Sequence, residues 1–256
     1  MNIGICNLTI VPLRNTASHR SEMVSQLLFG ERFEILDDQE EWIFVRLLDI
    51  PYEGWVQKGQ FELISFDINS GYSGIPVQVV DIAGAEVWTD NGIFVSLLPG
   101  TLVPAIFTKS NAFTPYRIEG DLRSAVSIDF RSEIQKLIYF YRNSPYLWGG
   151  RSHLGIDCSG LTQAVYRHFG VMLPRDAYQQ AEEGIVVDFL TEINPGDLAF
   201  FDNADGNITH VGVMIDKEHI MHASAKVRID KMDSEGIFNK DINRYTHKLR
   251  IIKRYF

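Results

Sequence analysis

Hydrophobic and polar residues alternate with a period of two along the first half of the chain, which indicates short β-strands. The clearest strand patterns are Phe33–Leu36, Trp42–Leu47 and Gly54–Val56, with turn-forming residues between them. A weaker set follows at residues 76–80, 85–88, 92–95 and 102–105. We expect two small all-β units, barrels or sandwiches, with a break near residues 65–73.

From about residue 125 the apolar residues recur at helical spacing. One predicted helix, residues 128–141, ends at Asn143-Ser144-Pro145, and a second begins near Cys158 and is stopped by Gly170. Leu173-Pro174-Arg175-Asp176 begins a short third helix. Strand patterns then occupy residues 197–201, 211–215, 219–223 and 249–255. Helices followed by antiparallel strands predict an α+β domain.

Composition and charge narrow the possible classes of protein. The 256 residues are 45% hydrophobic, which is enough for one to three domains with sizeable cores. The net charge of -9 disfavours polyanionic partners such as nucleic acid or teichoic acid. Two cysteines do not make a disulfide framework, so we expect Cys6 to be free and buried, with a bridge to Cys158 as the alternative.

The first residues, Met1 to Leu8, contain neither a basic segment nor a long apolar segment of the kind that forms a signal peptide. No stretch of about 18 apolar residues occurs, so we expect no membrane association. These features predict a cytoplasmic protein, and export by a route without such a signal is the alternative.

Cys158 lies in the run Gly155–Leu161, at the expected first turn of a helix. Free backbone N–H groups at a helix N-terminus lower the pKa of a thiol, and they can also hold a developing oxyanion. We therefore expect a cysteine nucleophile on an exposed, polar turn. A buried cysteine that acts as a small hydrophobic residue is the alternative.

Two histidines on strand-like segments are candidates for the base. The turn-like Asp216-Lys217-Glu218 lies midway between His210 and His222. A hairpin there pairs positions whose numbers sum to about 432, which places the two histidines opposite each other, with Ser224 on the same face. One imidazole would then act as base while the other orients it. Two surface histidines are the alternative.

His219, His222 and His210 also invite a zinc hypothesis, because zinc sites use closely spaced histidines. Positions 219 and 222 differ in parity, however, so their side chains point to opposite faces of a strand. We therefore expect neither a metal nor another cofactor.

The motifs, taken in order, resemble the NlpC family of bacterial cell-wall cysteine peptidases, which are relatives of papain. The matching pieces are Tyr146–Gly150, Gly155–Leu161, Leu173–Arg175, Pro195–Phe201, His210–Val213 and His222-Ala223. The resemblance implies a papain-like catalytic domain at residues 125–256. It also implies that Cys158 is the nucleophile, that His210 is general base and acid, and that His222 orients His210.

The N-terminal half resembles the bacterial SH3-like domains that are fused to one branch of this family. Two segments, Ser21–Gly30 and Asp49–Trp55, carry the likeness. It implies SH3-like barrels at residues 1–66 and 67–124. That branch, also called dipeptidyl-peptidase VI, hydrolyses the bond between γ-D-glutamate and a diamino acid in free murein peptides that begin with L-alanine.

An enzyme that requires a free N-terminus needs carboxylates to receive the ammonium group, since they would be left unpaired by a blocked substrate. By the resemblance, Asp157 and Glu22 are the candidates, Tyr52 would close the pocket, and Ser159 and Tyr146 are further contacts. Solvation of Glu22 and simple packing of the two tyrosines are the alternatives.

These observations predict a monomeric cysteine endopeptidase of peptidoglycan turnover, acting on L-Ala-γ-D-Glu followed by meso-diaminopimelate or L-lysine. The SH3-like domains would shape the substrate cleft instead of anchoring the chain to the wall. Two other hypotheses remain open: a papain-like amidase or acyltransferase, and a non-catalytic scaffold that binds wall fragments.

Overall fold

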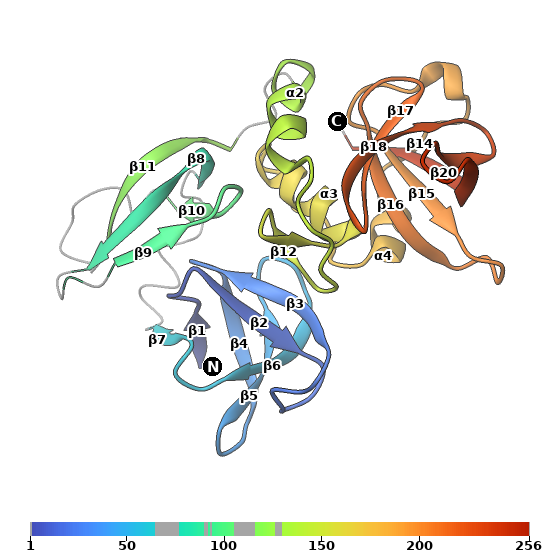
Figure 1. Ribbon diagram of the computed structural model, residues 1–256. Coiled ribbons are helices and arrows are strands. Elements are labelled where there is room, and N and C mark those ends of the chain that lie inside the picture. Colours follow the sequence, from blue (N-terminus) through green and yellow to red (C-terminus); the bar gives the residue numbers. More distant parts are fainter. Residues whose placement is uncertain are drawn as a thin grey trace. The chain divides into compact units, whose positions relative to one another are not determined.

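In the computed structural model, the chain forms two compact units. Figure 1 labels their helices and strands. One unit comprises Met1–Val126 with Gly170–Met172, and the other comprises Ser127–Phe169 with Leu173–Phe256. The structure describes residues 2–64, 77–89, 92, 94–104, 116–125 and 130–255. The predicted break at residues 65–73, together with Pro76, Ile93, Ala105 and Ile128, lies outside the described residues.

The first unit begins with a seven-stranded antiparallel sheet in the order β3-β2-β6-β5-β4-β1-β7. Its strands are β1 (Ile3–Ile5), β2 (Ile10–Arg14), β3 (Met23–Leu28), β4 (Arg32–Asp38), β5 (Trp42–Leu47), β6 (Glu53–Gln57) and β7 (Glu62–Ile64). The three clearest strand predictions lie in β4, β5 and β6 and are confirmed. Alternate side chains, such as Val11 and Leu13 of β2, fill one core. Cys6 is free and buried in this core, as predicted.

A second, four-stranded sheet follows, in which β8 pairs with β9, β10 and β11. The strands are β8 (Val77–Thr89), β9 (Phe94–Leu97), β10 (Leu102–Pro104) and β11 (Tyr116–Ser124). The prediction of separate strands at residues 76–80 and 85–88 is wrong, because β8 runs through both. Strand β11 pairs with β8 along most of this length. A register shift between Gly120 and Leu122 lies opposite the gap between the two predicted segments, because Gly120 pairs with Ala85 and Leu122 with Val80.

The second unit combines helices with a seven-stranded sheet in the order β14-β20-β15-β16-β17-β18-β19. The helices are α2 (Phe130–Tyr141), α3 (Cys158–Arg167), α4 (Ala177–Glu182) and the 3-10 turn η2 (Leu190–Glu192). The strands are β12 (Arg151–Ser152), β13 (Gly155–Ile156), β14 (Ile185–Val186), β15 (Leu198–Asp202), β16 (Ile208–Met214), β17 (His219–Ser224), β18 (Lys226–Met232), β19 (Gly236–Asn239) and β20 (Arg244–Arg254). An additional pairing of β19 with β20 closes strands β15 to β20 into a ring.

Helix α3 is the element that positions the candidate nucleophile. It packs against β16 and β17 of the ring, and every one of its residues is buried. The predicted α+β order of helices and antiparallel strands is therefore confirmed for this unit. Among the described residues, no helix is long and apolar enough to cross a membrane.

Candidate active site

Cys158 is the first residue of α3, and its thiol lies against strand β16. The carboxylate of Asp157 caps the helix by accepting a hydrogen bond of 2.7 Å from the backbone N–H of Gly160. Backbone groups of Val211 and Ser159 form hydrogen bonds with the sulfur. Only 9% of Cys158 is exposed. The prediction of an exposed turn is therefore wrong, because the polar run is covered by the rest of the unit.

The environment of Cys158 favours the neutral thiol. Burial, followed by the neighbouring Asp157 carboxylate, raises the pKa of this thiol to about 12. Hydrogen bonds from the backbone at Val211 and Ser159 lower the pKa, but by less. The prediction of a lowered thiol pKa is wrong for the free protein, because desolvation of a thiolate outweighs the helix N-terminus.

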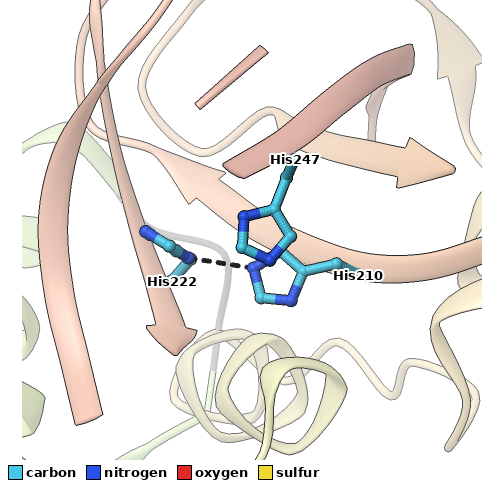
Figure 2. A group of neighbouring side chains, drawn as sticks. All are labelled: His210, His222 and His247. Carbon is cyan, nitrogen blue, oxygen red and sulfur yellow. Dashed lines mark hydrogen bonds between the residues drawn. The ribbon is translucent and has the colours of Figure 1, made fainter. Parts of the chain in front are cut away.

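His210 of β16 and His222 of β17 meet through their rings. His210 Nε2 lies 2.9 Å from His222 Nδ1, and the ring planes are nearly perpendicular (Figure 2). The residue directly opposite His222 is Gly212, so paired positions sum to 434 and the predicted register is wrong by two. A shift of two keeps both side chains on one face of the sheet, so the rings still reach each other diagonally.

Asp230 of β18 extends this chain of hydrogen bonds. Its Oδ2 lies 3.0 Å from His222 Nε2, and both side chains are buried. Burial raises the pKa of Asp230, but hydrogen bonds from His222 and Arg228 outweigh this and hold the pKa at about 2. An ionised carboxylate only accepts hydrogen bonds, which assigns the proton of His222 to Nε2. His222 Nδ1 then accepts from His210 Nε2–H, and the lone pair of His210 Nδ1 is left available.

His247 of β20 completes a cluster of three imidazoles (Figure 2). Its ring stacks on that of His210 with a centroid separation of 4.0 Å and an interplanar angle of 22°. Burial and the two neighbouring histidines hold the pKa of His210 well below its usual range, and burial, then His222, lowers the pKa of His247 to about 4. The rings of His210 and His247 are therefore neutral near pH 7.

A cavity of about 290 Å³ opens beside this cluster. It is lined by Tyr146, Thr209, His210, Ala223, Ser224, Ala225 and His247. Burial, followed by the proximity of Cys158 and Asp157, raises the pKa of Tyr146 to about 12. The structure thus brings the predicted residues Tyr146 and His210 together in one cavity, with Ser224 on the same side as the histidines, as expected.

Asp157 and Ser159 are engaged by a residue to which the sequence reasoning assigned no role, Arg175. Arg175 Nη2 donates to Asp157 Oδ2 at 2.5 Å, and Arg175 Nη1 donates to Ser159 Oγ at 2.8 Å. Asp157 Oδ2 also accepts from the backbone N–H of Gly149 at 2.9 Å. The carboxylate therefore has structural partners, and its contact with a substrate ammonium stays a prediction, as does that of Ser159.

Three other predicted residues belong to other elements of the chain. Glu22 is exposed directly before β3 in the first unit, and Tyr52 is half-buried against the core of the first sheet. Their contact with substrate stays a prediction. His219 is hydrogen-bonded to Asp216 at 2.9 Å on the β16–β17 turn, and the histidine cluster contains His247 in its place.

Two functional candidates, Asp230 and His247, were missed from the sequence. Asp230 lies on β18, a strand for which no pattern was recognised, and His247 lies on β20 before the predicted strand start at residue 249. One signal was available for His247: it shares an alternating polar segment with Tyr245 and Leu249, which is typical of a strand that is exposed on one face.

Comparison with known families identifies two segments. Residues 143–246 match the NlpC/P60 family, and residues 13–61 match the family described as the bacterial dipeptidyl-peptidase SH3 domain. The first match includes Cys158, His210 and His222, and the second lies within the seven-stranded sheet of the first unit. The N-terminal part is thus an SH3-like β region and the C-terminal part an NlpC/P60 domain.

Individual proteins agree with these family matches. The γ-D-glutamyl-L-lysine dipeptidyl-peptidase of Bacillus subtilis is 29% identical over 219 residues, covering 78% of this chain and 71% of the relative. The probable endopeptidase NlpC of Escherichia coli is 31% identical over 118 residues, covering 45% of this chain and 76% of the relative. A crystal structure of an NlpC/P60 family protein from Bacillus cereus has the same fold, with a TM-score of 0.79, 18% identity and 99% of each chain covered.

Proposed function

Since this chain belongs to the NlpC/P60 family of cysteine peptidases, we propose that it hydrolyses the bond between γ-D-glutamate and a diamino acid in free murein peptides. The observation that supports peptidase chemistry most directly is the hydrogen-bonded series His210, His222 and Asp230 beside the Cys158 helix. The substrate class is proposed from the Bacillus subtilis relative, whose name specifies the γ-D-glutamyl-L-lysine bond and whose match extends over both units.

The first step of the proposed reaction is a coupled proton transfer and attack. Cys158 and His210 are both neutral at rest, because burial disfavours the charged form of each. The thiol proton passes to His210 Nδ1 while the sulfur forms a bond to the γ-D-glutamyl carbonyl carbon. His222 stabilises the resulting imidazolium through its Nδ1, which accepts the His210 Nε2 proton.

The later steps return the site to its starting state. The tetrahedral oxyanion is held by the backbone N–H at the N-terminus of α3, and the imidazolium of His210 gives its proton to the leaving amine as the C–N bond breaks. Water then attacks the thioester with His210 as base. The C–S bond breaks, the thiol regains its proton, and L-Ala-γ-D-Glu is released.

Recognition of the free N-terminus is the second part of the proposal. Tyr146 lines the cavity beside His210, and Asp157 adjoins the nucleophile, so both are proposed contacts. Glu22 and Tyr52 are proposed for the same recognition on the strength of the family resemblance. Glu22→Gln and Tyr52→Phe test these roles, since loss of a contact to the substrate raises KM for the free peptide.

Mass spectrometry of L-Ala-γ-D-Glu-meso-diaminopimelate and of the L-lysine analogue tests the reaction, with each N-acetylated peptide beside them. Cleavage of the free peptides alone, abolished by Cys158→Ala, is the expected result. Cleavage of acetylated peptides as well retains the peptidase but removes the roles of Asp157, Glu22 and Tyr52. Full activity of Cys158→Ala contradicts the proposal.

A further inference from the structure

His210, His222 and His247 converge from three strands of the same ring, β16, β17 and β20 (Figure 2). One nitrogen of each ring lies within 4.8 Å of one nitrogen of both others. His210 Nε2 and His222 Nδ1 are 2.9 Å apart, and two nitrogens that bind one tetrahedral zinc ion lie about 3.3 Å apart. His210 and His222 therefore need little movement to bind one ion, whereas the His247 ring, which stacks on that of His210 with an interplanar angle of 22°, must turn until its nitrogen faces the ion.

The outer nitrogens of two rings already have the partners that orient metal-binding histidines. His222 Nε2 is held by the Asp230 carboxylate at 3.0 Å, and His247 Nδ1 lies 2.9 Å from Thr246 Oγ1. A carboxylate or hydroxyl on the far nitrogen fixes the tautomer and directs the other nitrogen toward the ion. His222 Nδ1 and His247 Nε2 are therefore the nitrogens presented to the cluster.

Ions have a route to the cluster along its exposed side. His247 is half-buried and lines two cavities, the one of about 290 Å³ beside Tyr146 and another of about 450 Å³. The larger cavity is also lined by Asp202, Glu235 and Lys248, so acidic residues outnumber basic ones there, which favours cations. A divalent ion in either cavity therefore meets His247.

From this arrangement we propose that His210, His222 and His247 form a site for a zinc-class divalent ion, and that the bound ion inhibits the enzyme. Three neutral nitrogen ligands select zinc, copper or nickel over magnesium and calcium, which prefer oxygen ligands. Binding of the ion is independent of the proposed substrate, whereas inhibition rests on the proposed function.

The proton positions explain the inhibition. In the resting site, His210 carries its proton on Nε2, where it is donated to His222, and Nδ1 is the proposed base. The ion takes the lone pair of Nε2, so that proton moves to Nδ1 and no proton leaves the ring. His210 then has no lone pair with which to accept the Cys158 thiol proton, and the first step is blocked.

Zinc binding to the full chain is measured by competition with a chromophoric chelator, after metal is removed with EDTA. We expect one zinc ion per chain, affinity reduced roughly tenfold or more in His247→Gln, and unchanged affinity in the matched control His219→Gln. Magnesium should not compete. No zinc binding, or loss of binding in His219→Gln but not in His247→Gln, overturns the site.

X-ray absorption at the zinc edge identifies the ligands of the bound ion in the wild-type chain, without any substitution. Three imidazole ligands at about 2.0–2.1 Å are expected. Fewer than three imidazoles, or a shell dominated by sulfur, overturns the proposal. Both measurements stand whether or not the murein peptides are cleaved, so a failure of the proposed function is distinguishable from a failure of the site.

Inhibition is then measured with the substrate that the wild-type chain cleaves. We expect zinc to inhibit wild type and His219→Gln at equal concentrations, and EDTA to restore activity. Zinc that binds at the three histidines without slowing cleavage overturns the inhibitory part of the proposal.

Discussion

At the scale of single residues, Asp230 determines the proton positions of the histidine series although it lies beyond His222. Its ionised carboxylate accepts from His222 Nε2 and from Arg228, and the partners of Arg228 include the exposed Asp241. In Asp230→Asn the amide can donate to His222 Nε2, which favours the wrong tautomer and removes the acceptor for His210. We expect kcat to fall roughly 10- to 100-fold with little change in KM.

Asp241→Asn is the matched control for this prediction, because it changes a carboxylate on the same arginine without touching a histidine. It should leave kcat within about twofold of wild type. Steady-state kinetics on the free tripeptide, with thermal unfolding of each variant, make the comparison. Equal losses in the two variants would show that Arg228, not the tautomer of His222, is what matters.

Arg175 gives a second prediction at this scale, for stability. It forms a buried pair with Asp157, whose side chain is 7% exposed, whereas Arg46 and Glu53 form an exposed pair on the first sheet. Arg175→Met leaves the helix-capping carboxylate buried without its cation, so the free energy of unfolding should fall by about 3–5 kcal/mol. Arg46→Met should change it by no more than about 1 kcal/mol. Urea unfolding followed by circular dichroism measures both, and comparable losses would refute the argument.

At the scale of elements, the strength of the hydrophobic pattern decided what could be predicted. Helix α3 has apolar residues at helical spacing, and strands β16 and β17 are largely buried segments that contain apolar runs, so Cys158, His210 and His222 were found from the sequence. Strand β18 buries Asp230 next to charged residues, and the first half of β20 is polar. Such strands are held by pairing with their neighbours, which a single sequence does not display.

Register and desolvation were both predicted wrongly. The turn residues Asp216 to Glu218 are centred on Lys217, and Ile215 pairs with His219 across them, so paired positions sum to 434; the predicted sum of 432 placed the centre one residue too early, at Asp216. The burial that raises the pKa of Cys158 comes from side chains distant in sequence. The sequence therefore placed Cys158 correctly at the start of a helix, but it did not predict that the thiol is protonated.

Strand β19 supplies an element-scale prediction, because it holds β20 and therefore His247 in place. Gly236 has φ 137°, and a Cβ atom there would lie 1.8 Å from the backbone oxygen of His247. Gly236→Ala must therefore separate the two strands as well as strain the backbone. In the control, Gly206→Ala, φ is 82° and nothing lies within 4 Å of the new Cβ.

We expect Gly206→Ala to lower the free energy of unfolding by about 1–2 kcal/mol, the cost of the left-handed conformation alone. Gly236→Ala should cost at least about twice as much, because the close contact with the backbone is added to it. Denaturant unfolding of the wild-type chain and of both variants measures these two losses of unfolding free energy. Equal destabilisation would mean that β19 and β20 move apart freely at this point.

At the scale of the whole molecule, the order of an SH3-like region before an NlpC/P60 domain was predictable, because it rests on motifs that survive in order along the chain. The net charge of -9 is a property of the same scale. It opposes tight binding to a polyanionic wall, and it is compatible with small free peptides, whose ammonium group is attracted to carboxylates.

We therefore expect Cys158→Ala, which binds substrate without consuming it, to associate with the free tripeptide but not with whole sacculi. Sedimentation with purified sacculi at low salt is the stringent condition, since it leaves attraction and repulsion between charges least screened. Calorimetry with the tripeptide provides the positive measurement on the same sample. Strong sedimentation with sacculi would instead assign the SH3-like region to wall anchoring, and it would move the cleavable bond from free peptides to the intact wall.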